Sequence, residues 1–254
     1  MTSSSTRVAL VTGANKGIGR AVARQLGARG MCVYLGARNE SRGRAAEREL
    51  CAEGLDARFV RLDVTDESSV ALAAKRIDEE AGRLDVLVNN AGTGGPPTPP
   101  SQTSTDQVRR TFETNVFGVV TVTNAMLPLL RRSPSGRIVN VSSLLGSLAY
   151  AAERTDPTGL FPPGVFPVVL DYNTSKAALN AVTITYANEL RDTGILVNAV
   201  SPGFVATDIN EHRGILTPEQ GARIPVLLAT LGDDGPTATF VSEDGTATGL
   251  RLAW

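Results

Sequence analysis

The chain has 254 residues, of which 42% are hydrophobic and 20% are charged, and its formal net charge is −1. This length can bury the core of one α/β domain, and the composition is ordinary for a folded globular protein. The near-neutral charge, with no basic block, argues against a nucleic-acid partner and against binding to a charged membrane surface.

Targeting and metal-binding signals are not recognisable in the sequence. Residues 1–6 form a short polar tail, expected to be flexible, and no stretch approaches 18 uninterrupted apolar residues. The two cysteines, Cys32 and Cys51, are too few for a disulfide framework or a zinc site. We therefore expect a cytoplasmic protein with no membrane span and no metal site.

Apolar runs alternate with segments of helical periodicity along the chain. We expect strands over residues 8–12, 32–36, 59–64, 85–89, 137–141, 195–200 and 239–242, and helices over residues 18–29, 67–80, 105–130 and 172–191. Strands that are apolar on both faces and separated by helices indicate a parallel sheet covered on both sides. With right-handed crossovers, this predicts one doubly wound, Rossmann-type α/β domain over residues 1–254, with about seven strands.

The turn after the first strand is rich in glycine. It reads Thr-Gly-Ala-Asn-Lys-Gly-Ile-Gly over residues 12–19 and leads into the first helix. Small residues let the backbone approach a pyrophosphate, and the helix N-terminus offers free N–H groups and a positive dipole end. Its place between a strand and a helix predicts nucleotide binding. The spacing T-G-x-x-x-G-x-G resembles the short-chain dehydrogenase/reductase family.

Further segments extend this resemblance over nearly the whole chain. Asp63-Val64 ends the third expected strand, Asn89-Asn90-Ala91-Gly92 ends the fourth, and Ser201-Pro202-Gly203, with Thr207, follows the sixth. In the family, these segments contact adenine, line the cofactor and lie beside the nicotinamide, respectively. Each segment is short, and their order on the expected elements carries the resemblance.

The end of the second strand bears on the choice of nicotinamide. NAD-selective sites usually place a carboxylate there to bond the ribose 2′-OH. Here Ala37 takes that position and Arg38 follows, with Glu40 expected to face solvent. A guanidinium can hold a 2′-phosphate by bidentate hydrogen bonds, and Lys16 would add a second cation. An exposed loop charge is the alternative interpretation of Arg38, but the missing acid favours NADPH/NADP+.

The glycine turn, the second strand end and the resemblance together predict a set of cofactor-binding residues. These are Gly13, Asn15, Lys16, Gly17, Ile18, Gly19, Arg38, Asp63, Val64, Asn89, Ala91, Gly92, Tyr172, Lys176, Pro202, Gly203 and Thr207.

The chemical centre is expected at Tyr172 and Lys176, which have the spacing Y-x-x-x-K. Residues i and i+4 of a helix share a face, so the phenol and the ammonium point into one space. A free phenol titrates near pH ~10, and a nearby cation is expected to lower that value. The pair is then suited to protonate a carbonyl oxygen while hydride reaches the carbon.

The resemblance implies three further roles. Ser143 would hydrogen-bond the substrate oxygen, with Ser142 as the alternative, and Asn115 would hold a water that relays protons through Lys176. Lys176 would also hold the nicotinamide ribose. The expected catalytic set is therefore Asn115, Ser143, Tyr172 and Lys176. The lone His212 is expected to be a surface residue.

The chain departs from the family pattern between Ser143 and Tyr172, which are 29 positions apart, about twice the usual separation. The extra segment, residues 144–170, resembles the insertion of the carbonyl-reductase branch, whose members are often monomeric, so a monomer is expected. Residues 144–170, 93–100 and 204–221 are expected to wall an apolar pocket.

These features predict NADPH-dependent reduction of a bulky, apolar ketone or aldehyde to an alcohol. Two alternatives keep the same fold and site: a dedicated secondary-metabolite ketoreductase or imine reductase, and a non-redox cyclase. An NADP-binding sensor without turnover is a third, and the complete catalytic set argues against it because a sensor needs no proton donor.

Overall fold

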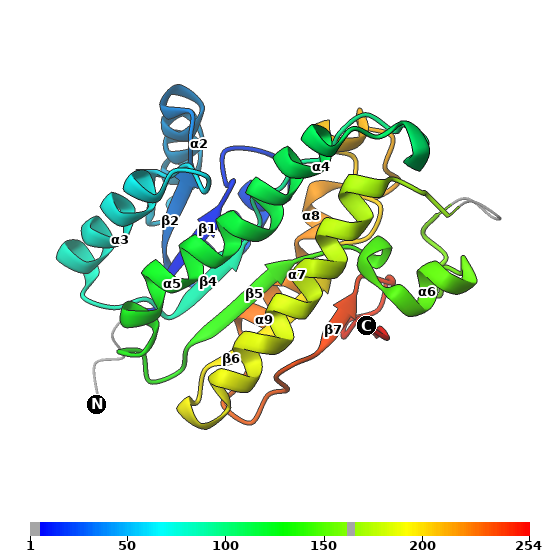
Figure 1. Cartoon of the computed structure of the whole chain (residues 1–254). Coiled ribbons are helices and arrows are strands. Elements are labelled where there is room, and N and C mark those ends of the chain that lie inside the picture. The colour runs from blue at the N-terminus through cyan, green and yellow to red at the C-terminus, as the bar shows by residue number, and fades with distance from the viewer. Residues whose placement is uncertain (1–5, 162–165) are drawn as a thin grey trace.

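Eight strands form one sheet in the computed structural model, which describes residues 6–161 and 166–254 (Figure 1). They are β1 Val8–Thr12, β2 Cys32–Ala37, β3 Ala57–Arg61, β4 Val86–Asn89, β5 Arg137–Val141, β6 Leu196–Ser201, β7 Phe240–Ser242 and β8 Leu250–Arg251. Their order across the sheet is β3-β2-β1-β4-β5-β6-β7-β8. All neighbours are parallel except β7 and β8, which are antiparallel.

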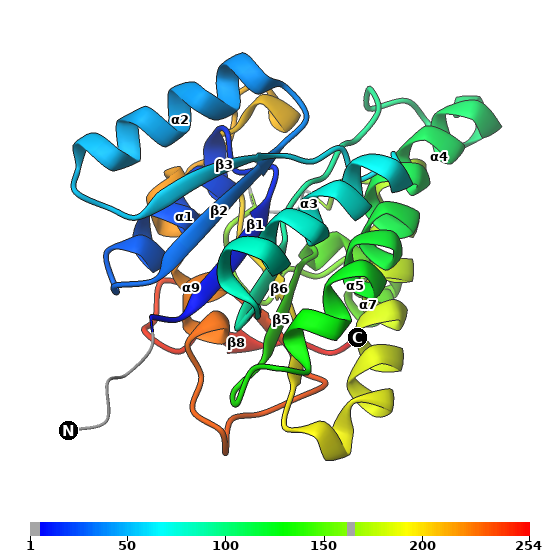
Figure 2. The ribbon, with the colours of Figure 1, turned by 90° about the vertical axis from the view of Figure 1, so that its left-hand side faces the viewer.

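Helices cover both faces of this sheet. They are α1 Gly17–Gly27, α2 Glu40–Ala52, α3 Glu67–Ala81, α4 Thr105–Phe112, α5 Gly118–Leu130, α6 Leu148–Glu153, α7 Leu170–Glu189, α8 Pro218–Gly221 and α9 Arg223–Ala229. Figure 2 shows α1, α2 and α9 on one face, and α3, α5 and α7 on the other. The predicted doubly wound α/β fold is confirmed.

The alternation of side chains along each strand divides the core into two layers. In β1, Ala9 and Val11 are buried in the layer with α1, α2 and α9, whereas Val8 and Leu10 are buried in the layer with α3, α5 and α7. Because both faces of the strand are apolar, β1 has no solvent-facing side. This explains why the sequence reads as continuous apolar runs rather than as an alternating pattern.

Several element boundaries differ from the predictions. The third strand ends at Arg61 rather than at residue 64, because Asp63 accepts hydrogen bonds from the backbone and hydroxyl of Thr65 and starts a turn. The helix expected over residues 105–130 contains a π-helical turn at Glu113–Phe117. The sheet has eight strands instead of about seven, because the two-residue β8 is too short to leave a periodic signal.

Candidate active site

A groove of about 1000 Å³ runs along the carboxyl ends of the central strands. The strand order reverses between β1 and β4, which is where parallel α/β sheets bind their ligands. Most of the predicted cofactor residues line it: Gly13, Asn15, Lys16, Gly17, Ile18, Gly19, Arg38, Asp63, Val64, Ala91, Gly92, Tyr172, Lys176, Pro202 and Thr207. Asn89, Gly203, Asn115 and Ser143 do not line it and are described separately below.

The glycine turn is held against the end of β4. The hydroxyl of Thr12 accepts hydrogen bonds of 2.9 Å from the N–H groups of Asn90 and Ala91, and the Asn90 amide donates to the Thr12 carbonyl oxygen at 2.8 Å. A Cβ added at Gly19 would lie 2.6 Å from the Gly13 carbonyl oxygen. The backbone of α1 therefore approaches the glycine turn too closely at Gly19 for any side chain. Thr12 and Asn90 lie in the predicted glycine turn and in the predicted segment after β4, but they were left out of the predicted set of cofactor-binding residues; the polar end of an otherwise apolar strand was the available signal for their role in joining the two segments.

The turn leaves helix N–H groups for an anion. Lys16 is the N-cap residue of α1, and its side chain accepts no hydrogen bond from the helix. The first backbone N–H groups of α1 are therefore not capped by this residue. Gly13 and Gly17 have φ values of 66° and 54°, a region that glycine adopts without strain. This geometry suits the pyrophosphate of a dinucleotide.

The opposite end of the groove is exposed and carries cations. Arg38 forms no ion pair with any residue that the structure describes, and Ala37 places no carboxylate at the end of β2. Arg110 of α4 also lines the groove without an ion pair among the described residues, and the sequence did not single it out. Glu40 is exposed, as expected, and its carboxylate accepts a hydrogen bond from Arg44 at 2.9 Å. The guanidinium group of Arg38, at the end of β2, fits a phosphorylated ribose.

Lys16 differs from Arg38 because its side chain already has an ion-pair partner. Its ammonium pairs with Asp208 on the loop that follows β6, and this hydrogen bond holds the pKa of Asp208 below its ordinary value. His212 is exposed, as expected, and its Nε2 lies 3.0 Å from the other oxygen of Asp208. A 2′-phosphate therefore has to compete with Asp208 for Lys16.

Tyr172 and Lys176 meet at the buried end of the groove, on the first turns of α7. The Nζ atom of Lys176 lies 5.6 Å from the centre of the Tyr172 ring and donates a 2.8 Å hydrogen bond to the Val141 carbonyl oxygen. Burial lowers the pKa of Lys176 to about 8. Burial also raises the pKa of Tyr172 to about 12, against a lowering effect of its hydrogen bond with Ser143. The expected lowering by the lysine is therefore wrong for this structure, because desolvation of the phenol dominates.

The two serines after β5 have different partners. Ser143 is half-buried; its hydroxyl accepts a hydrogen bond from the N–H of Leu145 at 3.2 Å, and its interaction with the phenol acts to lower the pKa of Tyr172 against the larger, raising effect of burial. Ser142 is buried, and its hydroxyl donates to the Asn180 side-chain oxygen at 2.6 Å. Ser143 is thus beside the phenol, while Ser142 already uses its proton within the protein. Of the two serines, Ser142 lines the groove and Ser143 does not, so proximity to the phenol is the feature that distinguishes Ser143 as the partner of a substrate oxygen.

Asn115 lies in the π-helical turn and is fully buried. Its amide oxygen accepts from the N–H of Thr93 at 2.9 Å, and its amide nitrogen donates to the Thr93 carbonyl oxygen at 2.8 Å and to Ser175 at 3.0 Å. A Cβ added at Gly92 would lie 3.5 Å from this amide oxygen and 3.6 Å from Nζ of Lys176. The side chain of Asn115 therefore fixes the loop after β4, close to the lysine.

Two predicted cofactor residues lie behind the groove wall. Asn89 is buried, and its amide donates to Thr123 at 3.1 Å and to Asn140 at 2.9 Å. Gly203 has a φ of 81°, and a Cβ there would lie 2.6 Å from Leu216 and 2.8 Å from Leu160. Gly203 therefore lies where the loop after β6 packs against Leu160 of the insertion.

The described part of the insertion packs against the C-terminal segment. The N–H of Ala149 in α6 donates to the Trp254 carbonyl oxygen at 3.3 Å, and the Trp254 ring stacks on Phe240 at 5.5 Å. Phe161 contacts Phe204 of the loop after β6, with ring centres 5.5 Å apart. Residues 162–165 of the expected insertion lie outside the described residues.

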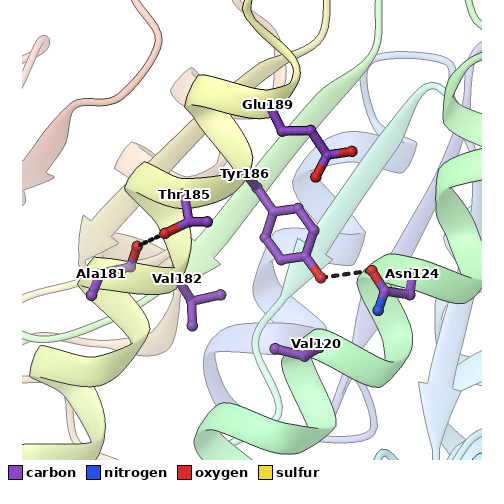
Figure 3. A pocket seen from close by; sticks show the side chains of 7 residues that line it. All are labelled: Val120, Asn124, Ala181, Val182, Thr185, Tyr186 and Glu189. Atoms are coloured by element: carbon purple, nitrogen blue, oxygen red, sulfur yellow. Dashed lines mark hydrogen bonds between the residues drawn. The ribbon is translucent and has the colours of Figure 1, made fainter.

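A second, smaller groove lies between α5 and α7 (Figure 3). The Tyr186 hydroxyl donates to the Asn124 side-chain oxygen across it at 2.7 Å. It shares no lining residue with the first groove. Among the described residues there is no group of three or more metal-ligating side chains and no helix long and apolar enough to cross a membrane.

Comparisons with known proteins identify the family of this chain. The family model for short chain dehydrogenase matches residues 7–155 and 164–215. Carbonyl reductase [NADPH] 1 of Bos taurus is 37% identical over 275 residues, covering 95% of this chain and 98% of the relative. (-)-Isopiperitenone reductase of Mentha piperita is 35% identical over 307 residues, covering 94% and 96%.

Solved structures show the same relationship. Salutaridine reductase from Papaver somniferum has a TM-score of 0.80 and 32% identity, covering 92% of this chain and 99% of its own. NADPH-bound carbonyl reductase from chicken fatty liver has a TM-score of 0.82 and 26% identity, covering 98% and 99%. With its sheet, glycine turn and Tyr-Lys pair, the chain belongs to the short-chain dehydrogenase/reductase family.

Proposed function

We propose that this protein reduces a ketone or aldehyde to an alcohol with NADPH, and that Tyr172 is the proton donor. The observation that carries the proposal is that Tyr172, whose phenol interacts with Ser143, and Lys176 both line the buried end of a groove whose other end carries Arg38. Relatives named as NADPH carbonyl reductases support both the reaction and the cofactor.

The groove fits the cofactor at both ends. The glycine turn and the α1 N-terminus suit the pyrophosphate, while Arg38, with Lys16, suits the 2′-phosphate. Asp63 and Val64 line the groove and would contact the adenine, and Lys176 would hold the nicotinamide ribose. When bound, NADPH supplies the hydride.

Residues of the chain donate and replace the proton that the reduction consumes. A phenol with a pKa of about 12 is protonated at neutral pH, so Tyr172 can donate to the oxygen that becomes negative as the carbonyl is reduced. Ser143 holds that oxygen by a hydrogen bond. The Lys176 ammonium stabilises the phenolate that remains, and a water beside Asn115 returns the proton through Lys176.

Substrate size follows from the walls of the pocket. Ile209 of the loop after β6 lines the groove and is 50% exposed, whereas the exposed apolar side chains of Leu148 in α6 and Ile215 in the same loop do not line it. Exposed apolar side chains around a cleft indicate an apolar ligand. The loop over residues 204–221 therefore supports a bulky, apolar carbonyl compound as the substrate, and residues 144–161 are assigned to the pocket only by the resemblance of the insertion to the carbonyl-reductase branch.

We also propose one domain, a monomer and a cytoplasmic location. One continuous sheet supports the single domain. Likeness of the insertion to that of the carbonyl-reductase branch supports the monomer, and light scattering that finds a stable tetramer would refute it. Both cysteines are unpaired, which suits a reducing compartment.

The test is NADPH consumption by the purified protein with aldehydes, aromatic ketones, diketones and quinones, and with NADH in parallel. We expect turnover that depends on Tyr172 and is much slower with NADH. NADPH binding without turnover on any of these compounds would contradict broad carbonyl reduction. It would favour a dedicated pathway enzyme, a non-redox catalyst or a sensor.

A further inference from the structure

The residue immediately before Tyr172 is a buried carboxylate. Asp171 has no accessible surface, and among the described residues it has no ion-pair partner. Unpaired buried carboxylates are costly unless hydrogen bonds replace the lost water. The contacts of Asp171 therefore indicate what its burial achieves.

Hydrogen-bond donors surround this carboxylate. One oxygen accepts from the Thr111 hydroxyl at 2.6 Å and from the N–H of Gly95 at 2.8 Å, and the other accepts from the Gln107 amide at 3.2 Å. Burial by itself raises the pKa of Asp171, but these bonds and one from the Tyr172 N–H outweigh it, so the net pKa is lowered. Asp171 also lies in the first turn of the 20-residue helix α7, where the dipole favours an anion.

The contacts of Asp171 connect three segments of the active site. Gly95 belongs to the loop after β4, Thr111 and Gln107 belong to α4, and Asp171 begins the turn of α7 that carries Tyr172. Gln107 reinforces the connection with a 3.3 Å bond to the Pro96 carbonyl oxygen. These residues are 60 and more positions from Asp171 in the sequence, so this carboxylate is a tertiary anchor rather than a helix cap.

The anchored loop lies on the ring of the proton donor. A Cβ added at Gly94 would lie 3.2 Å from Cδ2 of Tyr172. Asn115 holds the loop at Thr93, on one side of Gly94, and Asp171 holds it at Gly95, on the other. The phenol ring is therefore packed against a backbone that two buried polar side chains fix.

We propose that Asp171 is a positioning residue for the reaction, which sets the loop at residues 93–96 against the Tyr172 ring by accepting hydrogen bonds. This inference rests on the proposed role of Tyr172. It acts through acceptor oxygens rather than through charge, because the donors are a hydroxyl, an amide and backbone N–H groups. Misplacement of a reacting group by about 1 Å can cost about 100-fold in rate.

The chain offers a matched control at the other end of the sheet. Asp85 is also buried and accepts from a backbone N–H, Val8 at 2.7 Å, from a hydroxyl, Ser133 at 2.6 Å, and from a side-chain nitrogen, Arg83 at 3.2 Å. It precedes β4 and does not line the groove. Asp171→Leu and Asp85→Leu each remove bonds from a backbone N–H, a hydroxyl and a side-chain nitrogen, at sites that differ in their distance from the chemistry. Asp85→Leu also breaks the ion pair with Arg83, so its loss of stability should be at least as large.

The experiment compares these variants as full-length proteins, with the best carbonyl substrate of the panel above. For Asp171→Leu we expect kcat to fall about 10- to 100-fold and the substrate KM to rise, with the NADPH dissociation constant within about twofold of wild type. Asp171→Asn keeps an acceptor oxygen and should recover most of kcat. Asp85→Leu should lower the melting temperature without lowering kcat per folded molecule.

Milder substitutions keep the proposal testable if the leucine variants fail to fold. Thr111→Val removes only one donor and should lower kcat several-fold, whereas Thr111→Ser should not; Ser133→Ala is the matched change beside Asp85. Hydrogen exchange needs no substrate: the backbone amides of Thr93, Gly94 and Gly95, which precede two prolines without an N–H, should exchange faster in Asp171→Leu and not in Asp85→Leu.

The outcomes separate this inference from the proposed function. Unchanged exchange at the amides of residues 93–95, or equal kcat losses in the Asp171 and Asp85 variants, would overturn the role of Asp171. Loss of activity in Asp171→Asn as large as in Asp171→Leu would overturn positioning through acceptor oxygens. Undiminished turnover by Tyr172→Phe would instead refute Tyr172 as proton donor and leave the exchange result standing.

Discussion

The two ends of the groove differ in how far their ionisable groups are exposed to solvent. At the catalytic end, Tyr172 and Lys176 are largely removed from water, and burial moves both pKa values, to about 12 and about 8. At the adenosine end, Arg38 is exposed and unpaired in the described chain, and the Lys16–Asp208 pair has side chains that are 51% and 57% exposed. A low-dielectric site makes each interaction strong, whereas an exposed site is screened by salt.

This difference predicts two kinds of mutational effect. Substitutions at the buried end should change kcat and respond little to ionic strength, because the affected groups act during proton transfer. Substitutions at the exposed end should change the KM or dissociation constant for NADPH, and their effects should shrink as salt is added.

The largest expected effect is that of Tyr172→Phe, which removes the proton donor and keeps the ring. We expect kcat to fall by about 10²- to 10⁴-fold while NADPH still binds. Tyr186→Phe is the control, because Tyr186 lies on the same helix but donates its hydroxyl proton to Asn124, outside the active-site groove. Steady-state kinetics with fluorescence titration of NADPH measures both quantities. Equal losses in the two variants would contradict a specific role for Tyr172.

The next largest effect is the pH dependence of reduction. The pKa of Lys176 is about 8 in the free protein, so the ammonium is protonated below that pH and neutral above it. Tyr172 keeps its proton through this range, because its pKa is about 12. We therefore expect kcat/KM for NADPH to be constant below about pH 8 and to fall, by at most tenfold per unit, above it.

Rates between pH 6 and 10, measured on protein shown to remain folded, test this dependence. A profile that stays level to pH 10 would show that the lysine keeps its proton at the buried end. In that case burial would not lower the pKa of Lys176, and the two ends of the groove would not differ in this respect.

At the exposed end, Arg38→Ala should weaken NADPH binding about 10- to 100-fold, the worth of hydrogen bonds to a charged group. NADH binding should hardly change, because NADH has no 2′-phosphate. Arg42→Ala provides a nearby exposed arginine that does not line the groove. Titrations at low and high salt should show the loss shrinking with ionic strength. An equal loss for NADPH and NADH would instead place Arg38 on the adenine.

The sequence predicts the exposed and central parts of the groove better than its buried surroundings. Glycines in a turn, a missing acid at Ala37 and the Tyr172–Lys176 spacing are local patterns, and their residues line the groove. Strands such as β1 are predicted closely because both of their faces are apolar. The helix α2 was missed because only Gly43, Ala46 and Leu50 of its residues are buried, so it has no apolar stripe of large side chains.

What the sequence does not predict depends on tertiary packing. The contacts of Asp171 with α4 and with the loop after β4 join residues far apart in the chain, and no local pattern marks them. The raised pKa of Tyr172 follows from burial, which the helical spacing alone does not reveal. Asn89 is different: alternation along β4 places it on the face of Leu87, toward α5, so its position could have been inferred.

The smallest predicted effect concerns the pair that bridges the groove. Asp208→Asn removes a carboxylate that competes with a 2′-phosphate for Lys16, and exposed ion pairs contribute little, so NADPH binding should tighten only about two- to fivefold. Asp244→Asn is a suitable control, since Asp244 lies outside the groove. Tighter binding at low salt that vanishes at high salt would support competition at an exposed, screened site. Weaker binding would contradict competition. It would show that the Lys16–Asp208 contact holds the loop after β6 over bound NADPH, so that this end of the groove is less exposed in the complex than in the free protein.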